Sequence, residues 1–202
     1  MPLIRGHYPQ TNPLWALTGS LANLTNSSIP VRSNLEYTGL ANPTDGALAA
    51  TGVACFVPIP VEPGTVITKV GILVGATAGG TITHQFAAIY SGIATPALIA
   101  QSTDTTSAAI AASGLATWTL NATPAITQAQ APQGFIYAGI CVTASTIPTA
   151  LTVSIPTAVG YQWFTGGPLF LSATAGSGLL GTAAATIASP AAKAVAPLVF
   201  LT

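Results

Sequence analysis

Three residues of the types used in hydrolytic catalysis lie close together in the sequence, at His84, Ser102 and Asp104. In a catalytic triad the aspartate orients the histidine, and the histidine takes the proton of the serine nucleophile. Serine and threonine are common throughout this chain, however, and it has no Gly-x-Ser-x-Gly segment of the kind that presents a nucleophile in α/β-hydrolases. Because His84 also falls on an apolar strand face, we expect it to be a packed structural side chain and the chain not to be an enzyme.

The sequence contains few residues from which other kinds of site could be built. The carboxylates are Glu36, Asp45, Glu62 and Asp104, each in a turn or arm context, so a positioned pair for glycoside hydrolysis is not expected. The glycine-rich segment 176–178 lacks the following lysine that a phosphate-binding loop would use. We therefore predict no catalytic residue, no bound cofactor and no metal site.

The chain is unusually poor in charge. Of its 202 residues only 4% are charged, the four basic and four acidic residues cancel, and none lies between residues 105 and 192. A typical soluble domain is about one quarter charged. Four cations cannot form the basic patch of a nucleic-acid-binding protein. Because near-zero net charge promotes association, this composition favours a subunit of an assembly.

Membrane insertion and secretion are not expected either. A spanning helix needs about 20 consecutive apolar residues, and the apolar runs here are interrupted by glycine, proline, threonine or lysine. The first residues contain no apolar run of signal-peptide length, which predicts synthesis in a cytoplasm.

Alternation of apolar and polar residues begins near residue 53 and predicts a series of short strands. They cover residues 53–61, 66–74, 81–90, 97–102, 116–120, 135–143, 150–155 and 194–201. With turn residues between them, they predict an all-β fold, an antiparallel β-sandwich of jelly-roll-like type over residues 51–202.

Local signals add detail to these strands. Gly79 and Gly80 predict a hairpin, the prolines of segment 53–61 predict an edge strand or a strand end, and residues 104–113 could form one or two helical turns. In the strand at 81–90, alternation places the following residues on one face: Ile82, His84, Phe86, Ala88 and Tyr90. Cys55 and Cys141 lie in apolar runs, which favours buried free thiols.

Residues 1–50 differ from the rest of the chain. They contain four of the charged residues and several prolines, and their hydrophobic residues follow no sustained period. We predict an extended N-terminal arm that docks on neighbouring subunits, with Leu14, Trp15 and Leu17 as contact residues, because exposed apolar side chains of this size need cover.

The densest aromatic cluster is formed by Tyr161, Trp163 and Phe164. Packing in the core or at a subunit interface is one interpretation of this cluster. The alternative is a platform on which Tyr161 and Trp163 stack against a host-surface glycan.

Two segments resemble a known class of proteins. HQFAAIYSGIATPALIAQSTD (84–104) and GFIYAGICV (134–142) are similar to strands in virion proteins of tailed bacteriophages, of the minor-tail, fibre and head-decoration type found in phages of actinobacteria. The resemblance covers about residues 60–145. It implies a β-sandwich that decorates or extends a virus particle, often as a trimer, without a cofactor and without catalytic residues.

Composition and resemblance together predict a non-enzymatic structural protein of a phage particle. Its partners would be other virion proteins, either major capsid or tail proteins, together with further copies of itself. A receptor-binding module of the tail, recognising a host glycan, is the alternative function. No coiled-coil or collagen-like shaft is evident in the sequence, which argues against a long fibre.

Overall fold

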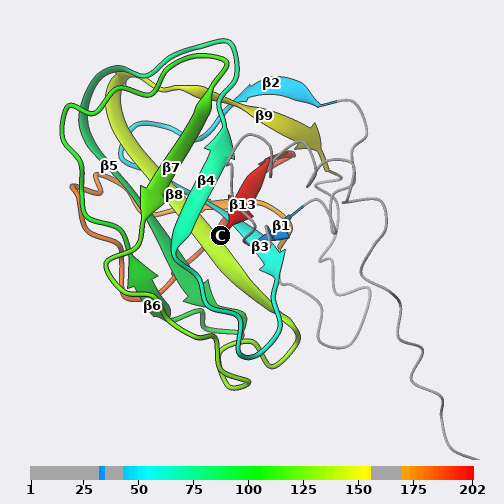
Figure 1. Cartoon of the computed structure of the whole chain (residues 1–202). Helices are drawn as coiled ribbons and strands as arrows, with labels where there is room; N and C mark the ends of the chain where they lie inside the picture. Colours follow the sequence, from blue (N-terminus) through cyan, green and yellow to red (C-terminus); the bar gives the residue numbers. More distant parts are fainter. Residues whose placement is uncertain (1–31, 35–42, 156–169) are drawn as a thin grey trace, which may run out of the picture. The chain divides into compact units, whose positions relative to one another are not determined.

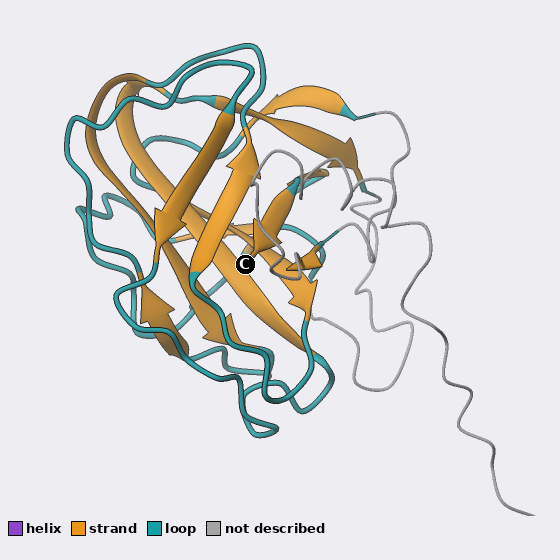
Figure 2. Ribbon diagram, viewed as in Figure 1, coloured by secondary structure: helices purple, strands orange, loops and turns teal. Residues whose placement is uncertain are grey.

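The computed structural model describes residues 32–34, 43–155 and 170–202, and these contain thirteen strands and no helix. All strand pairs are antiparallel, so the predicted all-β class is confirmed (Figure 2). Since the described residues form no helix, none of them provides a helical membrane span. The helical turns predicted at 104–113 are wrong, because the main chain there bonds to the edge of a strand.

The strands form three sheets (Figure 1). The four-stranded sheet has the order β1 (Arg32–Ser33), β13 (Val199–Leu201), β4 (Lys69–Leu73) and β7 (Leu115–Thr119). The six-stranded sheet has the order β11 (Ala191–Ala192), β10 (Ala173–Ala175), β3 (Ala54–Pro60), β8 (Phe135–Thr146), β5 (Gly80–Ser91) and β6 (Leu98–Gln101). The three-stranded sheet has the order β12 (Val195–Pro197), β9 (Thr149–Ser154) and β2 (Thr44–Ala47).

The six-stranded sheet is buried on both faces, which explains why its central strand β8 begins with eight consecutive buried residues. Alternation along a strand sends neighbouring side chains to opposite faces. One face of this sheet carries Phe56, Tyr90 and Tyr137, which pack in a cluster with Phe170 and Ile187 from the segment that follows β9. The other face carries the aliphatic core residues Val57, Ile59, Ile89, Ile136 and Ile140.

The four-stranded sheet supplies the second layer of the sandwich, with β4 and β7 crossing in front of β8 and β5 in Figure 1. Val70 and Ile72 of β4 are completely buried. Between them, Gly71 leaves room for the ring of Phe200, which lies 2.2 Å from where a Cβ would be. This close approach requires glycine at that position.

The predicted strands are present with small shifts at their ends, two details differ, and the prolines of segment 53–61 occupy the strand end that was one of their two predicted positions. The hairpin at Gly79 and Gly80 is wrong, because β4 and β5 belong to different sheets and the chain crosses between layers there. Segment 194–201 is not one strand, because β12 and β13 pair in different sheets. β3 lies inside its sheet, but Pro58 and Pro60 pair only with β8, beyond the reach of β10. The prolines therefore occupy a strand end, where their missing N–H groups cost no ladder bond.

Part of the predicted arm belongs to the sandwich. β1 pairs with β13, β2 pairs with β9, and residues Arg32–Thr202 form one compact unit. Residues 1–31, with Leu14, Trp15 and Leu17, lie outside the described residues, so their docking stays a prediction. Jelly-roll connectivity also stays a prediction.

Candidate functional site

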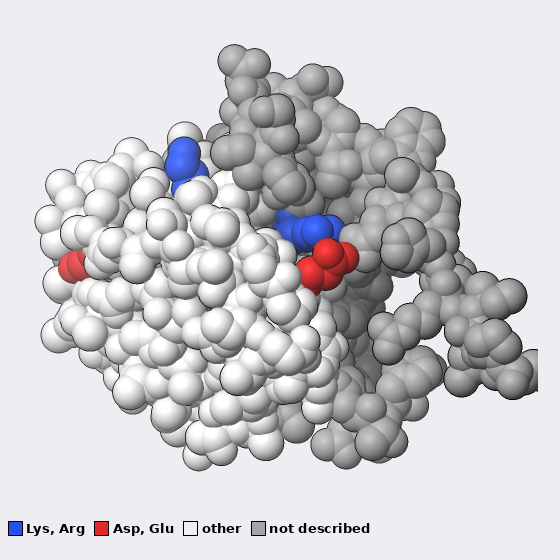
Figure 3. All heavy atoms as spheres, turned by 60° about the horizontal axis from the view of Figure 1, so that its bottom comes forward, with Lys and Arg blue, Asp and Glu red and all other residues white. Residues whose placement is uncertain are grey.

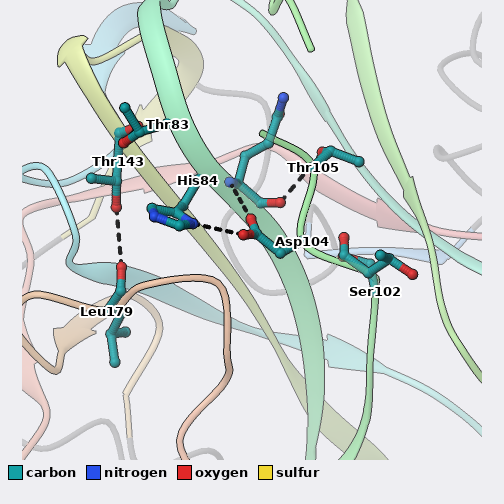
Figure 4. A network of polar contacts seen from close by, with 9 residues as sticks. Thr83, His84, Ser102, Asp104, Thr105, Thr143 and Leu179 are labelled. Atoms are coloured by element: carbon teal, nitrogen blue, oxygen red, sulfur yellow. Dashed lines mark hydrogen bonds and ion pairs between the residues drawn. The ribbon is translucent and has the colours of Figure 1, made fainter. Parts of the chain in front are cut away.

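The candidate site is the pair His84 and Asp104, at the end of β5 that extends beyond β6. His84 Nδ1 lies 2.6 Å from Asp104 Oδ2, and the two side chains are 29% and 22% exposed (Figure 4). β5 shifts its register against β8 between Ile82 and His84, so that Ile82 pairs with Ala144 and His84 with Thr143. Thr143 and Ala144 are adjacent in β8 and point to opposite faces, so their partners His84 and Ile82 also lie on opposite faces. The prediction that Ile82 and His84 share a face is therefore wrong.

The carboxylate of Asp104 is held from a second side. Its Oδ1 accepts a hydrogen bond from the Gln85 main-chain N–H at 2.9 Å. The Gln85 side-chain amide in turn donates to the Ala108 carbonyl at 2.6 Å, and the Thr105 N–H donates to the Gln85 carbonyl at 3.0 Å. These bonds fasten the segment after β6 along the edge of β5, so Asp104 contributes to the fold as well as contacting His84.

A third segment approaches this pair closely. A Cβ placed on Gly181 would lie 2.4 Å from Asp104 Oδ2, and Gly181 has a φ of +76°. Both the contact and the left-handed backbone require glycine. Nearby, the Thr143 hydroxyl donates to the Leu179 carbonyl at 3.1 Å, so the 179–181 segment is fixed against the end of β8 (Figure 4).

Ser102 does not complete a triad. Its hydroxyl accepts the Ala87 N–H at 3.0 Å and donates to the Thr103 carbonyl at 3.2 Å. In Figure 4, Ser102 lies on the side of Asp104 away from His84. Among the described residues, no hydroxyl or thiol forms a hydrogen bond with His84. In the described part of the chain, His84 is therefore oriented by Asp104 without a bonded nucleophile.

The two cysteines are buried and free, as predicted. The side chain of Cys141 lies on the same face of the sheet as that of His84, and Cys141 of β8 pairs with Phe86 of β5. Burial, and secondarily the negative charge of Asp104, raises the pKa of Cys141 to about 12. Burial also raises the pKa of Cys55. Since the thiolate is the nucleophilic form, neither thiol is activated for catalysis at neutral pH.

Within the described ranges, no group of three or more His, Cys, Asp or Glu residues could hold a metal ion. Charged side chains are also few on the surface. Figure 3 shows a face with few charged residues, two of opposite sign side by side, among uncharged ones.

Among the described residues, a cavity and a groove lie outside the His84–Asp104 pair. An apolar cavity of about 120 Å³ lies between the six-stranded sheet and segment 175–188, with Phe56, Phe86 and Tyr90 in its wall. The Tyr90 hydroxyl donates to the Ala184 carbonyl at 2.9 Å across it. A larger groove of about 540 Å³ runs between β7 and the segment after β6, and no charged side chain lines it.

Sequence reasoning named His84 and Asp104 but not Gln85 and Gly181, which complete their surroundings. Because the register shift before His84 interrupts the alternation, the sequence does not show that Gln85 is buried. Gly181 is distant in the sequence and is identified only by its position beside Asp104. The predicted contact residues Tyr161, Trp163 and Phe164 lie outside the described residues, so their contact with a glycan or a subunit stays a prediction.

The chain matches no family model, and the search of curated proteins also finds no match.

Proposed function

We propose that this chain is a non-enzymatic structural protein of a tailed bacteriophage particle. It would decorate or stabilise the capsid or tail surface by burying its own surface against major capsid or tail proteins and against further copies of itself, with a trimer as the favoured oligomer. It would be made in the host cytoplasm and reside in the virion. Its sandwich would be of the jelly-roll type, with residues 1–31 as the docking arm.

The observation that carries this proposal is the scarcity of charge on a chain with an extensive core. Only eight of the residues are charged, as four basic and four acidic side chains, although the sandwich buries both faces of its largest sheet. The exposed surface is therefore supplied mainly by uncharged threonine, alanine, glycine and serine. Such a surface costs little to desolvate, since burying an unpaired charge is far more expensive than burying a hydroxyl that finds a partner. This is the surface expected of a subunit covered by its neighbours.

The His84–Asp104 pair supports the non-enzymatic part of the proposal. The carboxylate is committed to His84 and to the Gln85 N–H, and the nearest candidate nucleophile, Ser102, bonds to main-chain groups instead. The resemblance of segments 84–104 and 134–142 to phage virion proteins is the reason for proposing a phage particle as the assembly.

Quantitative mass spectrometry of purified particles of the encoding phage tests the proposal. A copy number comparable with that of the major capsid protein would indicate capsid decoration, and a small fraction of it would indicate a tail component. Absence from intact particles would refute the structural function. Hydrolytic turnover that is lost on His84→Ala but retained in Ser113→Ala would refute the non-enzymatic part.

A further inference from the structure

The floor of the apolar cavity on the six-stranded sheet contains a pair of small residues. Gly139 of β8 pairs with Ala88 of β5, so this row of the sheet contributes only one methyl group there. On the same face of β5, Phe86 and Tyr90 lie on either side of Ala88, about 14 Å apart along the strand. The Phe56 ring covers Gly139, at 2.5 Å from where a Cβ would be. The space above Ala88 therefore lies between aromatic rings that do not fill it.

The roof of the cavity is built from short side chains. Segment 175–188 supplies it, and six of the seven residues that this segment places at the cavity are alanine, glycine or threonine. The seventh is Leu179, which packs against the aromatic cluster. Because the other side chains are short, the roof covers the space above Ala88 without filling it.

Hydrogen bonds hold the roof at this height above the sheet. The Leu179 N–H donates to the Gly52 carbonyl at 2.9 Å. Further along the roof, the Ala183 N–H donates to the Gln101 side-chain oxygen at 3.0 Å. Lowering the roof onto the sheet would break such bonds, and each broken bond leaves a polar group without its partner. The cavity is therefore a fixed feature of the fold.

The lining of the cavity offers little to a water molecule. The Tyr90 hydroxyl donates to the Ala184 carbonyl at 2.9 Å, so these two groups satisfy one another. Thr186 is the other residue with a polar side chain among the described lining residues, and it is exposed to solvent. A buried water needs about two to four polar partners, and an apolar cavity without them stays dry.

We propose that this cavity binds one small, uncharged, apolar molecule, up to about the size of benzene. Its volume of about 120 Å³ is close to that of apolar cavities of about 150 Å³ that bind benzene or xenon. The ligand would gain van der Waals contacts with a lining that otherwise faces empty space, and it would leave water favourably. The rings of Phe56, Phe86 and Tyr90 suit an aromatic ligand, which can meet them edge to face.

A thin roof gives such a ligand a way in. Gly176, Ala184 and Ala188 line the cavity and are also exposed, so a single layer of the chain separates the cavity from solvent at these positions. A small displacement of this layer would admit a molecule of the size of benzene. The inference uses only the interior of the sandwich and does not depend on the proposed function.

NMR titration of the full chain with benzene, following the methyl signals of its alanines, tests the proposal. Ala88 in the floor and Ala183 in the roof should shift saturably, with a Kd of about 1 mM, which is within the limit for a ligand of six non-hydrogen atoms. Pyridine has the same size but gives up a hydrogen bond to water on entry, so it should bind at least about tenfold more weakly. Equal binding of benzene and pyridine, or no saturable shift up to the solubility of benzene, would overturn the proposal.

Ala183→Leu, with Ala185→Leu as its matched control, locates the binding in the cavity. Both alanines belong to the roof segment, but Ala183 is buried in the lining, whereas Ala185 is exposed and does not line the cavity. Ala183→Leu places its larger side chain in the ligand's space and should weaken benzene binding at least about tenfold, while Ala185→Leu should keep the Kd within about twofold of the parent.

Ala88→Leu fills the same space from the floor and should weaken benzene binding as Ala183→Leu does, which covers the case in which one of the two variants fails to fold. Circular dichroism shows which variants are folded, and the comparison of benzene with pyridine needs no variant. Unchanged benzene binding in a folded Ala183→Leu or Ala88→Leu chain would show that the ligand binds elsewhere and would reject the cavity as the site. The particle copy number is measured separately, so failure here and failure of the proposed function can be distinguished.

Discussion

The buried thiol of Cys141 makes the stability of the fold sensitive to alkaline pH. Cys141 is 1% exposed, and burial together with the charge of Asp104 raises its pKa from 9.0 to about 12. In the unfolded chain the thiol would lose its proton near its ordinary pKa. A raised pKa therefore contributes stability that is complete below pH 9 and is lost as pH rises from there toward 12.

The size of the effect follows from the two pKa values. At pH 10 the thiol of the unfolded chain is mostly ionised, while that of the folded chain is not. One pKa unit corresponds to about 1.4 kcal/mol, so Cys141 should lower the free energy of unfolding by about 1.4 kcal/mol between pH 7.5 and pH 10. The raised pKa of Cys55 adds a loss of the same sign. The raised pKa of Tyr90 adds a smaller loss by pH 10, where the tyrosine of the unfolded chain is about half ionised, and a larger loss above that pH.

Urea unfolding under reducing conditions at pH 7.5 and pH 10, followed by circular dichroism, measures this loss. Cys141→Ala isolates the contribution of the one thiol. The substitution lowers stability at both pH values by leaving a small cavity, but it should make the loss between them smaller by about 1.4 kcal/mol. Cys55→Ala in the parent chain should likewise make the loss smaller, because burial also raises the pKa of Cys55.

An equal loss of stability in the parent and in Cys141→Ala would refute this reasoning. It would mean that Cys141 ionises as readily in the folded chain as in the unfolded one. Rapid reaction of the native protein with a thiol reagent at pH 8, at the rate of the denatured chain, would contradict it independently.

Two further pairs of substitutions test the packing and the contact between His84 and Asp104. Gly139→Ala should lower the free energy of unfolding by about 1–3 kcal/mol, because its Cβ would lie 2.5 Å from the Phe56 ring. Gly114→Ala is the control: the nearest atom to its Cβ would be 3.5 Å away, so it should cost less than about 0.5 kcal/mol. Equal urea midpoints for the two variants would contradict the close approach. Asp104→Ala removes the bonds to His84 and to the main chain and should cost about 2–3 kcal/mol, whereas Asp104→Asn, which keeps an acceptor for the main-chain N–H, should cost about half as much. Equal urea midpoints for these two variants would show that the main-chain bond contributes nothing.

Much of the β architecture could be predicted because period-two alternation reports which residues are half-buried. Where a strand is buried on both faces, this alternation is weak: the predicted segment 135–143 is a nearly continuous apolar run, and the structure buries both faces of β8 there. Segment 172–194 shows the limit of such reasoning. Its alanine, glycine and serine residues give no periodic signal, yet β10 and β11 form there because β3 offers a partner edge. Strand pairing compensates for weak local preference in this segment.

The sequence by itself determined the all-β class, the burial of the two thiols and the scarcity of charged side chains, because these depend on composition and on the local period of apolar residues. Only the tertiary structure decided which strands pair, and hence that Gly79 and Gly80 mark a crossing between sheets. It also decided that His84 meets Asp104 while Ser102 does not. Those outcomes depend on contacts between residues distant in sequence, whose free energy is gained only when the layers pack, so no local pattern in the chain records them.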